Sequence, residues 1–217
     1  MSHFITLEGP EGSGKTTQIQ LLQAFLTGQG CRVLATREPG GTPIGEQVRK
    51  ILHNPENEAM LPRAEVLLYS AARAQLVGQV IRPALASGVI VLCDRFAEST
   101  LAYQGYGRGL DLGALREITA FAVEGIRPDL VIYLDVPVEV GLRRKWAAYE
   151  REHAEWTRMD QQEIAFHERV RAGYLAMAAQ EPDRWCVIDA EQPVEAVQGE
   201  IRRCVEALLA REGGVRS

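Results

Sequence analysis

The residues best suited to chemistry form a glycine-rich run near the start of the chain. Residues 9–16 read GPEGSGKT, between an apolar run and a stretch with helical periodicity. Glycines let backbone N–H groups converge on phosphate oxygens at a helix N-terminus, while Lys15 adds positive charge and the Thr16 hydroxyl can ligate Mg²⁺. The pattern GxxxxGK[ST] in this setting predicts a P-loop that binds ATP or another nucleoside triphosphate. The predicted nucleotide-binding residues are Gly9, Pro10, Glu11, Gly12, Ser13, Gly14, Lys15, Thr16 and Thr17.

A second pair of residues suited to phosphate chemistry follows the apolar run of residues 89–93. Asp94 and Arg95 come directly at its end. A carboxylate there can hold Mg²⁺ through water, and the adjacent guanidinium can face a phosphate group. An ordinary ion pair at the end of a strand is the alternative. We expect Thr16 and Asp94 to hold Mg²⁺ and Arg95 to face the phosphates.

These residues need a scaffold that brings separate loops together. Short β-rich runs alternate with helical patterns along the chain. Strands are expected at residues 3–8, 32–37, 89–94, 130–135 and 185–189, and helices at 15–28, 44–52, 63–86, 97–104, 111–124, 138–151, 161–180 and 194–212. This alternation predicts an α/β fold, in which a five-stranded parallel sheet carries helices on both faces. Ligands of such sheets bind beyond the carboxyl ends of the strands, where both candidate sites fall.

Length and composition limit the number of domains, the partners and the location that we expect for the chain. The 217 residues suit one domain, 1–217, and the net charge of −5 argues against a nucleic-acid partner. The chain shows neither a signal peptide nor an apolar run of membrane-spanning length, so we expect a cytoplasmic protein with no membrane partner. Its four cysteines and four histidines lack metal-ligand spacing, and the scattered cysteines indicate no disulfide framework.

Longer motifs narrow the function. They are GPEGSGKTT at 9–17, TREPGGT at 36–42, LLYSAARAQ at 67–75, DRFAESTLAYQGYGRG at 94–109, RPDLVIYLDV at 127–136 and RVRAGYL at 169–175. Through them the chain resembles the bacterial thymidylate kinases over nearly its whole length. The resemblance implies a P-loop nucleotide kinase fold, with a mobile lid over approximately residues 141–160. It also implies transfer of the ATP γ-phosphoryl group to dTMP, giving dTDP and ADP, with Mg²⁺ dependence and a homodimer.

The resemblance implies roles for individual side chains as well. Arg95 should contact the dTMP phosphate, Tyr69 should stack on thymine, and Arg73 should reach the edge of the base. Tyr69 and Arg73 lie four residues apart in a helical pattern, so they share one face. Glu11 should accept the deoxyribose 3′-hydroxyl. The other expected substrate contacts are Glu38 and Pro39 at the sugar and phosphate, and Ser99, Thr100, Tyr103 and Gln104 at the base and sugar.

The acid within the P-loop has a consequence for catalysis. Phosphoryl transfer needs cations placed against developing negative charge, and Glu11 supplies none. The resemblance implies that the lid brings one instead. We expect Arg144 and Arg158 to reach the phosphates, with Arg151 as a third candidate, so the predicted catalytic residues are Lys15, Arg95, Arg144 and Arg158. The alternative is a charged, exposed helix of mixed sign.

Two other functions compete with this interpretation. A kinase for another nucleoside monophosphate or for a deoxynucleoside would share the fold, although Glu11, Tyr69, Arg73 and Tyr103 favour a thymine deoxynucleotide. A GTP-dependent switch or an ATP-binding regulatory module is the other alternative. The switch is disfavoured, because the chain's two asparagines lie in the run NPENE and form no guanine-reading NKxD pattern.

Overall fold

Five parallel strands form one sheet in the computed structural model, which describes residues 2–152 and 155–213. The strands are β1 (Phe4–Glu8), β2 (Val33–Arg37), β3 (Ile90–Asp94), β4 (Leu130–Asp135) and β5 (Trp185–Asp189). Their order is β2-β3-β1-β4-β5, so β1 is central and pairs with β3 and β4. The predicted five-stranded α/β fold is confirmed.

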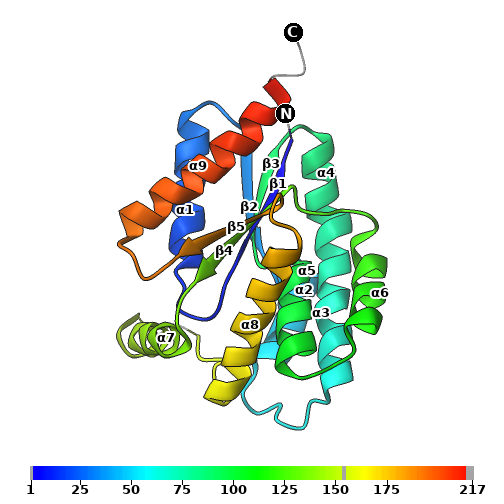
Figure 1. Ribbon diagram of the computed structural model, residues 1–217. Helices are drawn as coiled ribbons and strands as arrows, with labels where there is room; N and C mark the ends of the chain where they lie inside the picture. The colour runs from blue at the N-terminus through cyan, green and yellow to red at the C-terminus, as the bar shows by residue number, and fades with distance from the viewer. Residues whose placement is uncertain (1, 153–154, 214–217) are drawn as a thin grey trace.

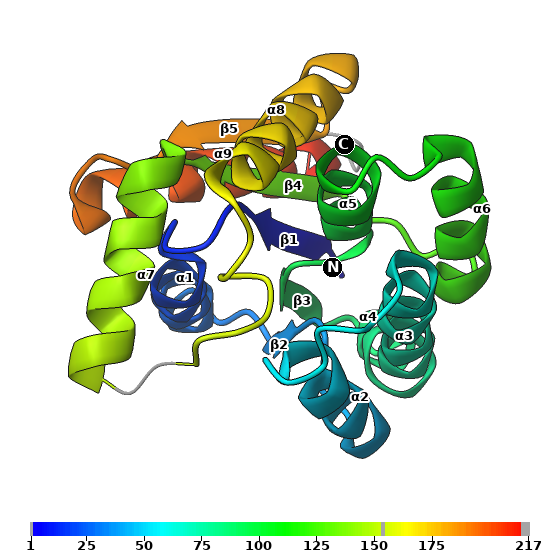
Figure 2. The same ribbon diagram turned by 90° about the horizontal axis from the view of Figure 1, so that it is seen from below.

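Helices cover both faces of this sheet (Figures 1 and 2). They are α1 (Lys15–Gly28), α2 (Pro43–His53), α3 (Pro62–Leu76), α4 (Arg82–Ala86), α5 (Ala97–Thr100), α6 (Leu112–Val123), α7 (Val138–Glu152), α8 (Ile164–Gln180) and α9 (Val194–Gly213). Helices α1 and α9 lie on one face, while α3, α5 and α8 lie on the other (Figure 2). Helix α6 lies beside α3, on the side away from the sheet.

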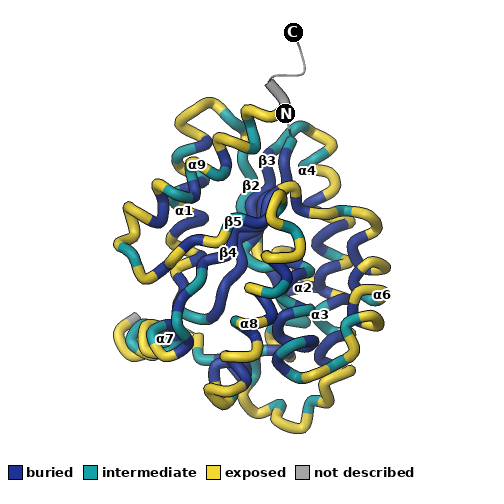
Figure 3. Tube along the Cα trace, in the orientation of Figure 1, coloured by how far each residue is buried: buried dark blue, intermediate teal, exposed yellow. Residues whose placement is uncertain are grey.

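Alternating strand side chains pack into apolar cores on both faces of the sheet. Ile5 and Leu7 of β1 join the core beneath α1 and α9, whereas the opposite face carries two cores, one of which includes Phe4 and the other Val131. The period of two places successive side chains on opposite faces, so a strand covered on both sides is apolar throughout. Figure 3 accordingly shows β1, β3 and β4 as buried.

Three predicted helices differ from the structure. The helix expected at 63–86 divides into α3, the π-helical segment η1 (Val77–Ile81) and α4. Pro83 is the second residue of α4, and its missing N–H interrupts the regular hydrogen-bond ladder. The helix expected at 97–104 begins as α5 and continues as the π-helical segment η2 (Leu101–Gly107). The helix expected at 161–180 begins only at Ile164, because residues 155–163 form a non-helical segment.

The cysteines also correct an expectation. Cys186 of β5 and Cys204 of α9 form a disulfide, with Cα atoms 6.7 Å apart. Their spacing in the sequence gave no sign of the pair, because packing of α9 on β5 brings them together. Cys31 and Cys93 are free, and Cys93 is buried.

None of the described helices combines the length and the apolar character that crossing a membrane requires. The predicted lid includes residues 153 and 154, which lie outside the described residues.

Candidate active site

A cavity of about 370 Å³ opens where the strands end. Its walls come from the P-loop and the start of α1, the loops after β2 and β3, helices α2, α3, α5 and α7, the π-helical segment η2, and residues 155–160. All the predicted substrate contacts line it: Glu11, Glu38, Pro39, Tyr69, Arg73, Arg95, Ser99, Thr100, Tyr103 and Gln104. Residues from distant parts of the chain therefore meet at the edge of the sheet where sequence reasoning placed the site.

The P-loop forms one end of the cavity. Gly12 and Gly14 adopt positive φ angles of 69° and 90°, a region that glycine enters without steric cost. A side chain on Gly12 would also collide with the backbone of Gly141, at the start of the predicted lid. The Lys15 ammonium donates to the carbonyl oxygens of Gly9 and Pro10 at 3.1 and 2.9 Å. The loop thus follows the course that a phosphate-binding loop requires.

Burial and charge both act on Lys15. Burial, followed by the nearby Arg95 guanidinium, lowers the pKa of Lys15 to about 8. An anionic phosphate in the cavity would offset both effects, since it would pair with the ammonium. The side chain is therefore suited to an anionic ligand.

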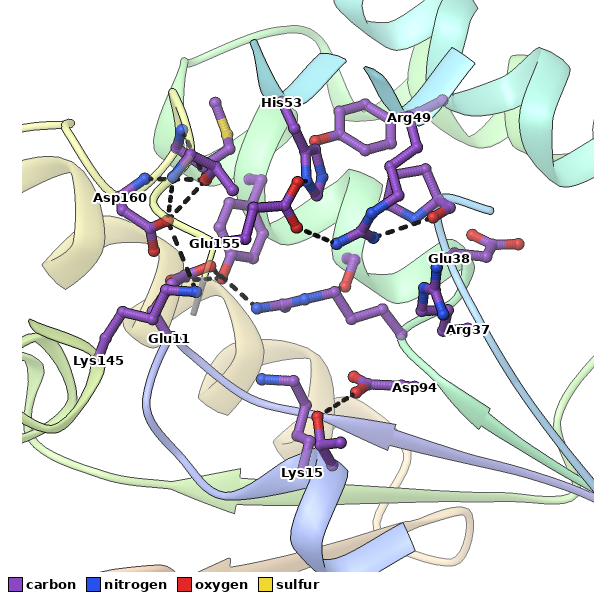
Figure 4. Close-up of a pocket in the computed structure, with 18 of the residues that line it drawn as sticks. Glu11, Lys15, Arg37, Glu38, Arg49, His53, Asp94, Lys145, Glu155 and Asp160 are labelled. Atoms are coloured by element: carbon purple, nitrogen blue, oxygen red, sulfur yellow. Dashed lines mark hydrogen bonds and ion pairs between the residues drawn. The ribbon is translucent and has the colours of Figure 1, made fainter. Parts of the chain in front are cut away.

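A hydroxyl and a carboxylate meet beside the P-loop. Thr16 Oγ1 donates to Asp94 Oδ2 at 3.2 Å, and both residues line the cavity (Figure 4). The contact joins the first turn of α1 to the carboxyl end of β3. Oxygen donors of this kind suit Mg²⁺, which completes its shell with water and phosphate oxygens.

Glu11, Arg95 and Tyr103 form one hydrogen-bonded network. Arg95 Nη2 donates to Glu11 Oε1 at 3.0 Å, and the Tyr103 hydroxyl lies 2.7 and 2.8 Å from the two carboxylate oxygens. The Arg95 guanidinium also lies over the Tyr103 ring, 4.9 Å from its centroid. Burial opposes ionisation of Glu11, but Arg95 and then Lys15 lower its pKa below the usual value. The P-loop acid is therefore a carboxylate held against Arg95, the residue that follows β3.

Arg95 itself has an unusual backbone. Its φ angle is 69°, which is uncommon for a residue with a side chain and carries a cost in free energy. A fully buried acid, Glu8, fixes the next turn by accepting from the Phe96 backbone N–H at 2.7 Å. Glu8 also accepts from the Ser99 and Tyr174 hydroxyls at 2.6 and 2.8 Å. The loop that presents Arg95 is thus anchored to β1 and α8.

Sequence reasoning overlooked Glu8 and Tyr174. The available signal was an acid at the end of an otherwise apolar strand, and a tyrosine within the RVRAGYL motif. Burial and the nearby Glu98 raise the pKa of Glu8 to about 7. Ser99, expected at the base and sugar, directs its hydroxyl toward Glu8 while it lines the cavity.

Arg73 is held by three different parts of the fold. Its Nε donates to Glu38 at 2.8 Å, and its two terminal nitrogens donate to Thr100 Oγ1 and to the Phe96 carbonyl at 3.0 Å each. Its side chain is 1% exposed, yet it contributes to the cavity wall. Tyr69 lies one turn earlier on α3 and lines the same cavity.

The predicted lid cations lie elsewhere than expected. Arg144 Nη1 donates to the carbonyl of Ala190 at 2.7 Å, in the turn after β5. Arg158 donates to Glu65, a buried acid of α3. Neither arginine lines the cavity, and Arg151 is exposed at the end of α7. The placement of Arg144 and Arg158 differs from the expectation because their long-range partners could not be read from the sequence. The role of the three arginines in catalysis stays a prediction.

Lys145 is a cation of α7 that does line the cavity. Its ammonium lies 3.8 Å from Asp160 Oδ2, and Figure 4 shows it extending from α7 toward that acid. The same Asp160 oxygen accepts from the backbone N–H and hydroxyl of Thr157. Sequence reasoning did not single out Lys145, although it lies within the predicted lid.

Glu155 links the described residues 155–163 to α2 across the cavity. Glu155 accepts from Arg49 at 2.5 Å and lies 3.0 Å from His53 Nδ1, two α2 residues that sequence reasoning also missed (Figure 4). The hydrogen bond with His53 lowers the pKa of Glu155 to about 2, against the effect of burial. This ionic contact closes one side of the cavity.

The fold and the site together define a class of protein. A P-loop joins β1 to α1, an acid ends the adjacent strand β3, and a second polar region shares the same cavity. These are the features of a P-loop nucleotide kinase. Residues 7–201 match the thymidylate kinase family model, and the chain belongs to that family.

Relatives match this chain over nearly its full length. It is 55% identical to the thymidylate kinase of Thermomicrobium roseum over 211 residues, covering 97% of this chain and 98% of that protein. It is 51% identical to the thymidylate kinase of Roseiflexus castenholzii over 222 residues, covering 97% and 95% respectively. The crystal structure of thymidylate kinase from Ehrlichia chaffeensis superposes with a TM-score of 0.75 at 32% identity, covering 94% of this chain and 98% of that one.

Proposed function

We infer that this chain transfers the γ-phosphoryl group of ATP to dTMP, giving dTDP and ADP, as a step toward dTTP. Membership of the thymidylate kinase family supports this inference. The observation that carries it is the shared cavity, in which Lys15 and Thr16 of the P-loop form walls together with Tyr69 and Arg73 of α3. One end thus suits a triphosphate, and the other suits an aromatic base. The proposed location of the reaction is the cytoplasm, where both ATP and dTMP would be available.

On the donor side, residues 9–17 would bind the ATP phosphates through backbone N–H groups and the Lys15 ammonium. Thr16 and Asp94 would hold Mg²⁺, and the proximity of their oxygens supports that assignment. The described residues contain no group of three His, Cys, Asp or Glu side chains suited to a metal. Such a site relies on phosphate and water oxygens, and Mg²⁺ supplies charge neutralisation between the phosphates.

On the acceptor side, Arg95 would contact the dTMP phosphate and Glu11 would accept the 3′-hydroxyl. Tyr69 would stack on thymine, while Arg73 would donate to the edge of the base. The remaining sugar and base contacts would come from Glu38, Pro39, Ser99, Thr100, Tyr103 and Gln104. Tyr103 and Glu11 share a hydrogen bond, which supports their placement on the same part of the sugar.

For the lid, we propose Lys145 as the cation that acts on the transferred phosphoryl group. It lines the cavity together with Lys15 and Arg95, whereas Arg144 and Arg158 have partners elsewhere. A positive charge placed there would stabilise the transition state.

A homodimer is a further part of the proposal. Two large apolar side chains lie exposed on adjacent helices, Leu67 on α3 at 58% and Phe121 on α6 at 86%. Apolar side chains exposed to this degree on neighbouring elements are typical of protein interfaces. A second copy of the chain, packed on α3 and α6, would cover them.

The function is tested with purified protein, ATP and four acceptors: dTMP, dUMP, dCMP and UMP. ADP release should be fastest with dTMP and nearly absent with ATP alone. Equal rates on all four acceptors would contradict the assignment to thymidylate. ADP release that is independent of any acceptor would indicate an ATPase instead.

A further inference from the structure

Glu65 lies outside the cavity wall but on the α3 face that supplies two predicted base contacts. Residues 65, 69 and 73 follow one another at four-residue steps, so Glu65 shares a helix face with Tyr69 and Arg73. Its side chain is 1% exposed. No role was assigned to it from the sequence.

Three side chains converge on the Glu65 carboxylate. Arg108 donates to both oxygens, through Nε at 2.7 Å and Nη2 at 2.9 Å. Gln104 Nε2 donates to Oε1 at 2.8 Å, and Arg158 donates to Oε2. Burial opposes ionisation, but the hydrogen bonds from Arg108 and then Gln104 lower the pKa of Glu65 below its usual value. Glu65 is therefore a carboxylate, which accepts hydrogen bonds and donates none.

This chemistry determines how the Gln104 side chain is turned. A carboxylate can pair only with the NH₂ group of an amide, so the Gln104 carbonyl oxygen must point away from Glu65. Gln104 lines the cavity. Within the described chain, the hydrogen bond of the Gln104 side chain is the one its Nε2 donates to Glu65. The carbonyl oxygen is thus left to accept from a ligand.

We propose that Glu65 sets the base specificity of this site, by holding the Gln104 amide so that its carbonyl oxygen meets the N3–H of a thymine or uracil ring. The proposal rests on the proposed function. Cytosine has an acceptor at N3, so the same arrangement would bring two acceptors, cytosine N3 and the Gln104 carbonyl oxygen, against each other. Arg73 donates only, which suits the O4 acceptor of thymine and opposes the 4-amino group of cytosine.

A different role for Glu65 would be purely structural, as the common partner of Arg108 and Arg158. The two roles make different predictions. Loss of a structural anchor lowers activity on every acceptor, whereas loss of amide orientation changes the ratio between acceptors. The selectivity ratio therefore separates them, since it cancels any loss of active protein.

The test compares kcat/KM for dTMP and dCMP in the wild type, in Glu65→Gln and in Arg108→Met. In Glu65→Gln the new amide can accept or donate, so Gln104 is free to turn over. Its dTMP/dCMP ratio should fall at least about tenfold, equivalent to about 1.4 kcal/mol. Arg108→Met removes one partner of Glu65 and keeps the carboxylate on Gln104, so its ratio should stay close to that of the wild type.

Each result decides the matter. An unchanged ratio in Glu65→Gln, or an equal fall in Arg108→Met, overturns the inference while the thymidylate kinase assignment stands. If the wild type fails to phosphorylate dTMP, the proposed function itself is wrong. If Glu65→Gln does not fold, Gln104→Met decides alone: the inference requires its dTMP/dCMP ratio to fall, and an unchanged ratio overturns it.

Discussion

Arg95 Nη2 lies 3.0 Å from Glu11 Oε1, which ties the loop after β3 to the P-loop. The pair joins the P-loop to the loop that supplies the proposed contact with the dTMP phosphate. It also explains why an acid can stand inside a loop that binds anions, because the guanidinium balances its charge. The carboxylate remains able to accept further hydrogen bonds, since each of its oxygens has two lone pairs.

Replacement of Glu11 by Gln should lower kcat/KM for dTMP by about tenfold or more, because a carboxylate accepts a stronger hydrogen bond from a hydroxyl group than an amide does. The loss should be smaller for the 3′-deoxy analogue of dTMP, which has no hydroxyl to donate. Steady-state kinetics with both acceptors measures the difference. An equal loss on the two acceptors would show that Glu11 acts only through Arg95.

Replacement of Lys145 by Met should lower turnover at saturating ATP and dTMP by about tenfold or more, if its charge stabilises the transition state. Arg144→Met, Arg151→Met and Arg158→Met are the matched variants, because each removes one cation from the same region. Normal turnover in Lys145→Met, with a tenfold fall in one of the arginine variants, would favour the expectation from the sequence over the placement in this structure.

Much of the fold could be predicted because its signals are local. The run from Val89 to Asp94 is almost entirely apolar, which predicts a strand covered on both faces. The motif GxxxxGKT predicts both the conformation of the loop and the phosphate group that it binds. The carboxyl ends of parallel strands meet at one edge, so Asp94 could be assigned to the site before any contact was known.

The unpredicted parts depend on long-range partners. Periodicity assigns a side chain to a face but does not identify what it meets there. Arg144 bonds a carbonyl that is 46 residues away, and Arg158 bonds an acid that is 93 residues away. The partners of Glu8 could not be predicted for the same reason, because its three hydrogen-bond donors come from the loop after β3, from α5 and from α8.

Glu8→Gln should change how stability depends on pH. Burial and Glu98 raise the pKa of Glu8 from its ordinary value of 4.5 to about 7. Between these values the folded chain holds a proton that the unfolded chain has lost, so the contribution of Glu8 to stability falls as pH rises. Urea unfolding at pH 5, 6, 7 and 8 should show the wild type losing free energy of unfolding relative to Glu8→Gln up to about pH 7. Parallel curves for the two proteins would contradict the raised pKa, and Glu117→Gln, at an exposed site, is the control.

Phe121→Asp should convert a dimer into a monomer. Phe121 is 86% exposed on α6, next to α3 with its exposed Leu67, so a charge placed there would have to be desolvated if a second copy covers this face. Light scattering after size-exclusion chromatography should give a mass for the wild type that is twice the 24.0 kDa mass of one chain. The variant should have the mass of one chain. Val194→Asp is the control, because Val194 is also exposed but begins α9 on the opposite face of the sheet. A monomeric wild type would contradict the proposed homodimer. A Phe121→Asp protein that remains dimeric would show that the interface lies elsewhere.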